Sequence, residues 1–548
     1  MKIHFKNFAH FAVVFFIFCN CQSQNKRVVS VEDSIKNAIT PSNAAYLGVV
    51  DFRIAPKSNI VIMPGTKEIP DRRYAFNHLT SLNFPNSVTA IGVAAFAFNS
   101  IENIVFPNQL TYIGEAAFIG NKLTEMDIPQ TLTEISARSF AGNSIMKTNI
   151  RDGIVAIGDY AFTANNLQAL VLPSSVNTIG DWAFAGNKIT NLIINEGTTV
   201  IGEGAFAANQ LSELVLPKSA KYIKAAAFAK NKLQKITLPS GLTVINAKLF
   251  AYNDFAAITL PETITAIYEG AFAANKIESI TIPGRVTIIG EKAFSDNVIK
   301  NLTLSSNLRT IGNEAFVNNK LTGVKLPVDL INLGEGAFAN NQLQKIIVPA
   351  RVRSVPARCF YNNNLTSAVL QSQMISFIGA YAFADNSLER ITIPSNVRRI
   401  EAHAFENNKL TVLRFLTGII RNIDESAFAH NKIELVYIPE SVSVIGAGAF
   451  EDNELKRISL PPSVKTIGEN AFAQNKLTSV KLPDNIKVIE KNAFAQNAIT
   501  QIIISKNRIF EKDSLGIYGE SFYAYYESIG KKSGTYNYAD GGWSFKPR

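Results

Sequence analysis

Residues 200–217 read VIGEGAFAANQLSELVLP, and residues 222–239 read YIKAAAFAKNKLQKITLP. The two stretches align without a gap at a constant offset. They share an Ile, an Ala-Phe pair, an Asn, a Leu and a closing Leu-Pro. A unit that recurs at a fixed period is the signature of a repeat architecture, in which each unit packs on its neighbours.

The Phe of the Ala-Phe pair marks the phase of this repeat along most of the chain. It recurs at one constant step from Phe96 to Phe360 and continues to Phe494. Only the steps that lead to Phe383 and Phe428 are longer, each by a single residue. An Asn stands three residues after each of these Phe, from Asn99 to Asn497. The regularity of the two positions predicts that both side chains have a structural role in every turn.

Each part of the unit predicts a local structure. The alternating apolar run before Pro, such as residues 213–216, predicts a strand, and Pro closes it because Pro cannot donate to a sheet ladder. The piece Val-x-x-Ile-Gly predicts a second short extended segment, in which Gly permits a turn that other residues resist. Gly-x-x-Ala-Phe predicts a short helix or a helical turn with Phe pointing inward. The Asn should be buried and should bond backbone groups of its own and neighbouring turns.

Composition agrees with a folded repeat array. The chain has 548 residues, of which 47% are hydrophobic, and its net charge is +10. The basic residues could suit an acidic partner, but they are scattered, so we interpret them first as solvated surface. The chain has three cysteines. Cys359 stands directly before Phe360, where most repeats have Ala, and is predicted to be a small buried hydrophobic residue. No disulfide framework or metal cluster can be built from this set.

The motif Leu-x-x-Leu-x-Leu-Pro followed by Val-x-x-Ile-Gly-x-x-Ala-Phe resembles the leucine-rich repeats of the bacterial surface protein A (BspA) type. The resemblance covers residues 60–505. It implies a β-rich leucine-rich-repeat solenoid of the α/β horseshoe type. Each turn of about 22 residues would hold a parallel strand, and the turns would form a right-handed coil. Asn stands here where many family members carry Cys, and it keeps a small polar residue in the loop.

These patterns divide the chain into five expected parts. Residues 1–21 are a signal peptide of the lipoprotein type, and residues 22–43 are a tether. Residues 44–83 are an N-terminal cap or degenerate repeat, because Phe76 is out of phase with the array. Residues 84–505 are the repeat array. Residues 506–548 are rich in aromatic residues and form a C-terminal cap; a carbohydrate-binding patch is the alternative for this tail.

The N-terminus has the form of an export signal. Lys2 and Lys6 precede an apolar run that is too short to span a bilayer. The run ends near Cys19 and Cys21, and this stretch resembles the lipobox of bacterial lipoproteins, which implies lipidation of Cys21. It departs from the common pattern at Asn20, where a small residue is usual. The alternative is a conventional signal whose cysteines have no role.

The positions seven and nine residues after each Phe should point outward from the strand. They form a sheet face of β-branched and basic residues that becomes more basic from Lys325 onward. This face is the best binding candidate because solenoids offer extended surfaces; the alternative is that such residues only suit an exposed sheet. The candidate ligand-binding residues are Lys325, Lys345, Arg390, Arg414, Tyr437, Arg457 and Lys481.

An enzyme is not expected. The histidines outside the signal, His78, His403 and His430, fall on different repeats, and HExxH, GxSxG and phosphate-binding glycine motifs are missing from the sequence. We predict no catalytic residues, no cofactor and no metal site.

The sequence therefore predicts an exported, lipid-anchored cell-surface binding protein. The family resemblance implies an adhesin and surface antigen that recognises extracellular-matrix or other cell-surface macromolecules, either protein or glycan. The membrane would be reached only through the lipid anchor, and nucleic acid is not an expected partner. The alternative is a periplasmic or envelope scaffold for protein docking without an adhesive face.

Overall fold

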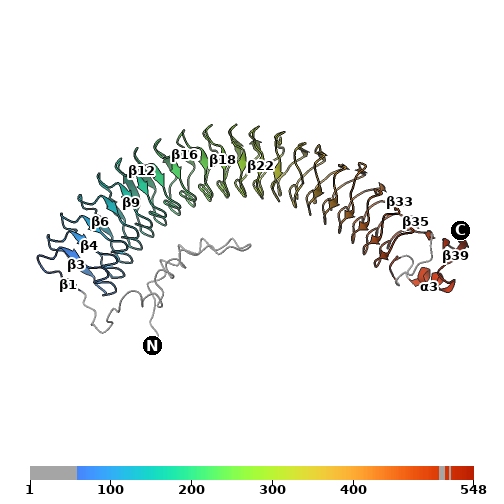
Figure 1. Ribbon diagram of the computed structural model, residues 1–548, viewed down its shortest axis with the longest axis horizontal. Helices are drawn as coiled ribbons and strands as arrows, with labels where there is room; N and C mark the ends of the chain where they lie inside the picture. The colour runs from blue at the N-terminus through green and yellow to red at the C-terminus, as the bar shows by residue number, and fades with distance from the viewer. Residues whose placement is uncertain (1–58, 505–512, 517–519, 548) are drawn as a thin grey trace, which may run out of the picture. The chain divides into compact units, whose positions relative to one another are not determined.

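The computed structural model describes residues 59–504, 513–516 and 520–547. The expected signal, the lipidation residue Cys21 and the tether lie outside these residues. The chain divides into two compact units, Met1–Gly241 and Leu242–Arg548. In each unit the strands are stacked turn upon turn, as Figure 1 shows. Both units contain long strands in the segment before Pro and short strands in the Val-x-x-Ile segment.

In the first unit, the parallel partners in the ladders of both strand types are one repeat apart: Ala169 pairs with Asn191, and Thr178 pairs with Val200. The long strands are β1 (Asn59–Val61), β3 (Ser81–Asn83), β6 (Glu125–Asp127), β8 (Lys147–Asn149), β10 (Ala169–Leu172), β12 (Asn191–Ile194), β14 (Glu213–Val215) and β16 (Lys235–Thr237). The short strands are β2 (Glu68–Ile69), β4 (Ala90–Ile91), β5 (Tyr112–Ile113), β7 (Glu134–Ile135), β9 (Ala156–Ile157), β11 (Thr178–Ile179), β13 (Val200–Ile201) and β15 (Tyr222–Ile223).

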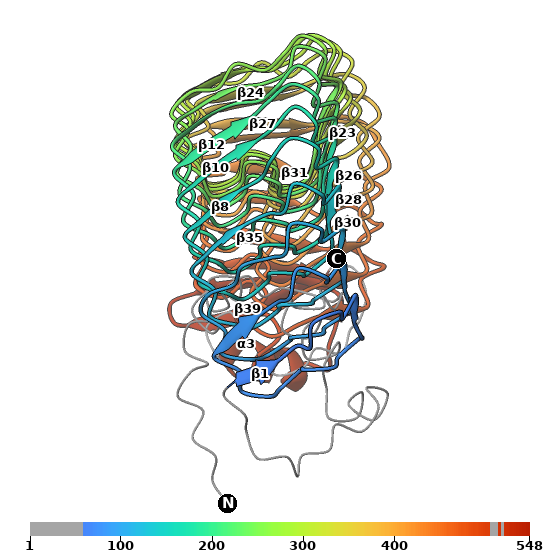
Figure 2. The ribbon, with the colours of Figure 1, turned by 90° about the vertical axis from the view of Figure 1, so that its left-hand side faces the viewer.

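The second unit repeats the arrangement, and Figure 2 shows its long strands β24, β27 and β31 in a different column from its short strands β26, β28 and β30. The long strands are β19 (Ser279–Thr281), β21 (Asn301–Thr303), β24 (Lys345–Val348), β25 (Ser367–Leu370), β27 (Arg390–Ile393), β29 (Val412–Phe415), β31 (Leu435–Tyr437), β33 (Arg457–Ser459), β35 (Ser479–Leu482) and β37 (Gln501–Ile504). The short strands are β17 (Val244–Ile245), β18 (Ala266–Ile267), β20 (Ile288–Ile289), β22 (Thr310–Ile311), β23 (Asn332–Leu333), β26 (Phe377–Ile378), β28 (Arg399–Ile400), β30 (Asn422–Ile423), β32 (Val444–Ile445), β34 (Thr466–Ile467) and β36 (Val488–Ile489).

The predicted parallel-strand solenoid is confirmed, and its more continuous sheets are made by the short strands. The long strands pair mostly in twos, whereas the short strands form a five-stranded sheet in each unit and a six-stranded sheet, β26 to β36, in the second.

The Gly-x-x-Ala-Phe segment is a hydrogen-bonded turn and not an α-helix. Ala95 N–H donates to Gly92 O at 3.3 Å, and Phe96 N–H donates to Ala117 O of the next turn at 2.8 Å. Residues two before and two after the Phe have positive φ, as at Ala94 (51°) and Phe98 (53°). Because left-handed residues interrupt a right-handed helix, the segment consists of hydrogen-bonded turns and not of the predicted short helix or helical turn.

Stacked Phe rings form the centre of the core. Phe294, Phe316 and Phe338 are fully buried, and the ring centroids of successive members lie 5.4 Å apart. At the start of the first unit the same place is taken by Tyr74, whose ring lies 5.4 Å from that of Phe96. Phe76, which the sequence marked as out of phase, is 42% exposed. The column of stacked rings therefore includes this irregular turn, in which Tyr74 takes the place of the Phe.

The Asn prediction is confirmed. In the second unit, Asn319 is buried, and its side-chain Oδ1 accepts the N–H of Ile299 at 3.0 Å. Its Nδ2 donates to Phe294 O of the preceding turn at 2.9 Å and to Phe316 O of its own turn at 3.2 Å. One amide therefore satisfies buried backbone groups of two turns, which explains why the position does not vary among the repeats. Cys359 is fully buried as expected, and burial raises the pKa of its thiol.

Where the short segment ends in Gly, as at Gly312, the residue allows a close approach of two turns, whereas an unusual turn was the expected reason for it. Gly312 lacks a positive φ, but a Cβ added to it would lie 2.5 Å from the backbone N of Glu291 in the preceding turn. We expect Gly312→Ala to lower the free energy of unfolding by about 1–3 kcal/mol, because the turns must move apart. Urea denaturation followed by circular dichroism measures this loss.

Gly284→Ala is the matched control for that substitution. A Cβ at Gly284 meets nothing within 4 Å, and its φ is not positive. The control should leave stability unchanged or raise it by less than about 1 kcal/mol. Equal losses in the two variants would contradict the close-packing explanation.

The aromatic tail pairs with the last long strand. It contains α3 (Glu520–Ser528), β38 (Gly534–Ala539) and β39 (Gly542–Pro547), and β38 runs antiparallel to β37. Tyr526 and Tyr536 are fully buried, with ring centroids 5.5 Å apart. These rings pack on one another and are not presented to solvent.

Candidate binding surface

Most outward positions of the long strands are exposed, as predicted, and Ser367, Ser479, Gln501 and Ile503 are partly exposed. In β27, Arg390 and Thr392 are exposed whereas Ile391 and Ile393 are buried, because side chains alternate between the faces of a strand. All seven candidate binding residues are exposed and lie in the second unit. Six of them lie within long strands, and Lys325 lies outside any strand.

The structure places five of the seven candidates on successive turns. Arg390, Arg414, Tyr437, Arg457 and Lys481 lie on β27, β29, β31, β33 and β35. Lys345 is separated from Arg390 by β25, whose outward residues are Ser and Val. The candidate face is thus a compact group with outlying lysines, and not an even basic sheet.

Two apolar residues that the sequence reasoning did not select complete this group. Val412 is 49% exposed and is the ladder partner of Arg390. Leu435 is 45% exposed and is the partner of Arg457, and Tyr437 is 72% exposed on the same strand. Both stand at the outward position seven residues after a Phe, where the period of the repeat identifies them, but they carry no charge. We define the Arg–Tyr patch as Arg390, Val412, Arg414, Leu435, Tyr437 and Arg457.

The charges of the Arg–Tyr patch are not neutralised within the described part of the chain. Its three arginines form no ion pair there, whereas neighbouring residues do: Lys456 Nζ lies 2.7 Å from Glu434 Oε2, and Lys476 Nζ lies 3.0 Å from Glu454 Oε2. The hydrogen bond from Lys456 lowers the pKa of Glu434. Exposed Arg and Tyr beside apolar side chains are the combination that contributes most to protein interfaces.

Two of the described histidines lie beside carboxylates. His403 Nδ1 lies 3.0 Å from Glu406 Oε2, and His430 Nδ1 lies 3.0 Å from Asp452 Oδ2, so each imidazole contacts a single carboxylate. The described residues contain no group of three His, Cys, Asp or Glu side chains placed to hold a metal ion. Within the same ranges, no helix is long and apolar enough to cross a membrane.

Comparison with known proteins gives a family. The model of the BspA-type leucine-rich repeat region matches residues 31–147, 89–211, 133–256, 183–299, 253–341, 287–411 and 421–515. No curated relative matches the chain.

Solved structures of leucine-rich-repeat proteins also resemble it. YopM from Yersinia enterocolitica is 18% identical over 90% of this chain and 96% of its own, with a TM-score of 0.44. A leucine-rich repeat protein from Bacteroides ovatus is 21% identical over 80% and 95%, with a TM-score of 0.40. A leucine-rich cell surface protein from Faecalibacterium prausnitzii is 21% identical over 64% and 87%, with a TM-score of 0.35.

The family model covers well over half of the chain, and its matches coincide with the stacked turns of both units. The chain therefore belongs to the family of proteins with BspA-type leucine-rich repeats.

Proposed function

We propose that this leucine-rich-repeat scaffold is an exported binding protein of the cell surface, anchored by a lipid on Cys21. Its Arg–Tyr patch binds a protein of the extracellular matrix or of a neighbouring cell. The observation that carries the proposal is the patch itself, in which exposed arginines and Tyr437 surround exposed Val412 and Leu435. Such a group contributes nothing to the core, and burying it in a complex would release its apolar surface from water.

Binding is tested with purified residues 22–548 and immobilised collagen, laminin and fibronectin as separate probes. We expect saturable binding to at least one probe. The combined variant Arg414→Ser, Leu435→Ser, Tyr437→Ser and Arg457→Ser should weaken it at least about 100-fold, because central Arg and Tyr residues of an interface each contribute about 2 kcal/mol.

The control replaces two basic and two apolar outward residues of the first unit: Lys147→Ser, Val171→Ser, Val215→Ser and Lys235→Ser. These positions are equally exposed on long strands but lie outside the patch. The control should bind like the unaltered protein. Failure to bind every probe, or equal weakening in both variants, would contradict the proposal.

The alternative function, an envelope scaffold without an adhesive face, differs in location. Protease added to intact cells should digest a surface protein, and it should leave a periplasmic one intact until the outer membrane is opened. Protection in intact cells together with the absence of matrix binding would favour the scaffold.

A further inference from the structure

A second row of basic residues lies outside the Arg–Tyr patch. Its residues stand seven positions before the repeat Phe, in five of the seven turns from Phe360 to Phe494. This position lies beside the short strands β26 to β36. We call Arg353, Arg398, Arg421, Lys465 and Lys487 the basic column. All five are exposed. The two intervening turns carry Ser376 and Ser443 at this position.

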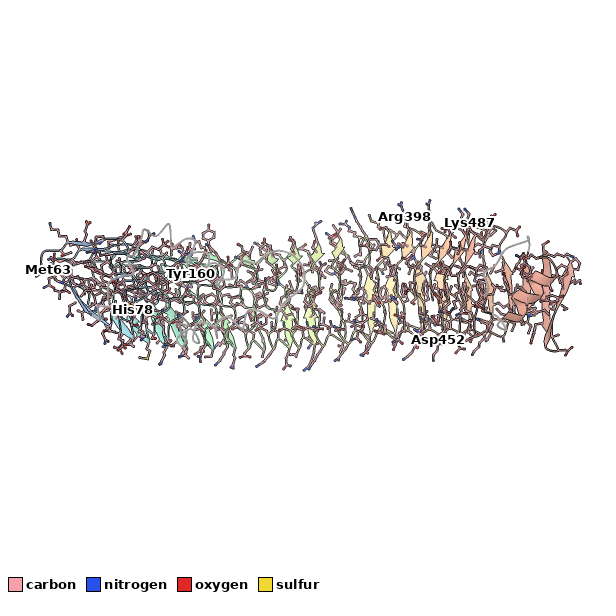
Figure 3. The ribbon with its side chains drawn as sticks, turned by 90° about the horizontal axis from the view of Figure 1, so that it is seen from below. Met63, His78, Tyr160, Arg398, Asp452 and Lys487 are labelled. Carbon is pink, nitrogen blue, oxygen red and sulfur yellow. The ribbon has the colours of Figure 1, made fainter. Side chains whose placement is uncertain are left out.

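Backbone hydrogen bonds hold the column in register through seven successive turns. Six N–H groups donate to the carbonyl of the equivalent residue in the preceding turn: Ser376 to Arg353 (3.0 Å), Arg398 to Ser376 (2.8 Å), Arg421 to Arg398 (2.9 Å), Ser443 to Arg421 (2.9 Å), Lys465 to Ser443 (2.9 Å) and Lys487 to Lys465 (2.7 Å). Neighbouring strands lie about 4.8 Å apart, so the bases follow one another at about 5 or 10 Å. In Figure 3, Arg398 and Lys487 lie along the same edge, whereas Asp452 lies on the opposite one.

Three acidic groups close in sequence to the column form hydrogen bonds with other residues. Asp424 Oδ2 accepts from Arg399 Nε at 2.5 Å, on the adjacent position of the short strand. Glu401 accepts the N–H of Ala380 at 3.1 Å, and Glu490 accepts that of Glu469 at 3.0 Å. None of the five bases of the column forms an ion pair within the residues that the structure describes. The column therefore carries uncompensated positive charge.

The fold does not require bases at this position. In the first unit, six successive turns carry neutral residues there, from Thr89 to Thr199. Like charges on neighbouring strands repel and lower stability. A row of five bases therefore has a small energetic cost that a bound anion would remove.

The geometry of the column fits a linear ligand with charges at regular intervals. Arg binds sulfate-like and carboxylate groups through two parallel hydrogen bonds, and Lys binds them as a point charge. Single-stranded nucleic acid would also need aromatic side chains on which bases stack. The column itself has none, and the nearest in sequence, Phe377, is 37% exposed. We propose that the basic column binds a linear acidic polysaccharide whose sulfate or carboxylate groups bridge successive turns.

Binding of the mature chain, residues 22–548, to immobilised heparin tests the proposal. The column variant carries Arg353→Ser, Arg398→Ser, Arg421→Ser, Lys465→Ser and Lys487→Ser. The control variant carries Lys345→Ser, Arg390→Ser, Arg414→Ser, Arg457→Ser and Lys481→Ser. Each variant loses three Arg and two Lys from exposed positions of the second unit, so their net charges are equal.

We expect the column variant to bind heparin about 100-fold more weakly than the unaltered chain, since each of five exposed charge pairs contributes modestly. The control should change less than about 3-fold. Affinity of the unaltered chain should fall steeply with added salt. Equal weakening in both variants would show that net charge alone attracts the polymer and would overturn the proposal, as would unchanged binding by the column variant.

Two further probes test whether the column prefers polysaccharide to other polyanions. Oligo(dT) and phosphatidylglycerol vesicles should each bind more weakly than heparin, and tighter binding of either through the column would overturn the assignment to polysaccharide. If the column variant with its five substitutions fails to fold, two double variants make the same comparison on adjacent turns. The double variant of the column is Arg398→Ser with Arg421→Ser, and its control is Arg390→Ser with Arg414→Ser. The proposal is independent of matrix-protein binding, because the control variant removes all three arginines of the Arg–Tyr patch and keeps the column.

Discussion

Replacing Asn319 by Ala should lower the protection of the Ile299 amide against hydrogen exchange about 100-fold. The substitution removes the acceptor of the Ile299 N–H and the donor to Phe294 O, and both backbone groups are buried. Unsatisfied buried polar groups cost about 1–3 kcal/mol each, so a local loss of about 3 kcal/mol follows. Amide exchange measured by mass spectrometry or NMR reports this loss at the affected turn.

The control for this prediction is Asn301→Ala in β21. Asn301 is an exposed outward residue of the long strand that belongs to the turn of Phe294. The same chemical change there should alter exchange by less than about threefold, because exposed substitutions shift stability by about 0.5 kcal/mol or less. A small effect at Asn319 would mean that the Asn ladder does not stabilise the stack.

Replacing Phe316 by Ala should lower the free energy of unfolding of the second unit by about 3–5 kcal/mol. The ring is fully buried and stacks on Phe294 and Phe338, with ring planes inclined by 1° and 9°. Its removal opens a cavity that the neighbouring rings cannot fill, since each is fixed by its own turn. Urea denaturation followed by circular dichroism measures the loss.

Phe377→Ala provides the comparison for the Phe stack. Phe377 lies at an outward position of β26 and is partly exposed, so its truncation removes the same atoms without leaving a closed cavity. We expect it to cost less than about 1.5 kcal/mol, in keeping with partial burial. Similar losses in the two variants would show that ring stacking is not the main contribution.

The sequence predicted the inward half of each turn well. Phe and Asn recur because each must fit one place in a stack, and the structure puts Phe316 and Asn319 in those places. The sequence predicted a structural role for the Gly of the short segment, but the predicted reason, an unusual turn, was wrong at Gly312. At Gly312 the Gly is explained by close contact with the backbone of the preceding turn. This contact depends on the distance between two turns, which the sequence of a single repeat does not contain.

The outward half could not be predicted to the same extent. The selected bases Arg390, Arg414 and Arg457 do lie on the exposed face, but Val412 and Leu435 beside them were not selected. An exposed apolar residue looks like any other strand residue in the sequence. The pairing of strands places Val412 beside Arg390 and Leu435 beside Arg457.

The sequence by itself determined the period, the inward positions and the family, because the same packing requirement is repeated in every turn. The tertiary structure alone decided which outward residues become neighbours. In the longer step from Phe405 to Phe428, Arg390 of β27 still pairs with Val412 of β29 at the regular period, whereas Arg399 of β28 pairs with Asn422 of β30, one position later. The added residue is therefore taken up in the turn between β29 and β30. The hydrogen bond between turns, from Arg421 N–H to Arg398 O, places these two residues of the basic column side by side although they are one residue further apart than the usual period.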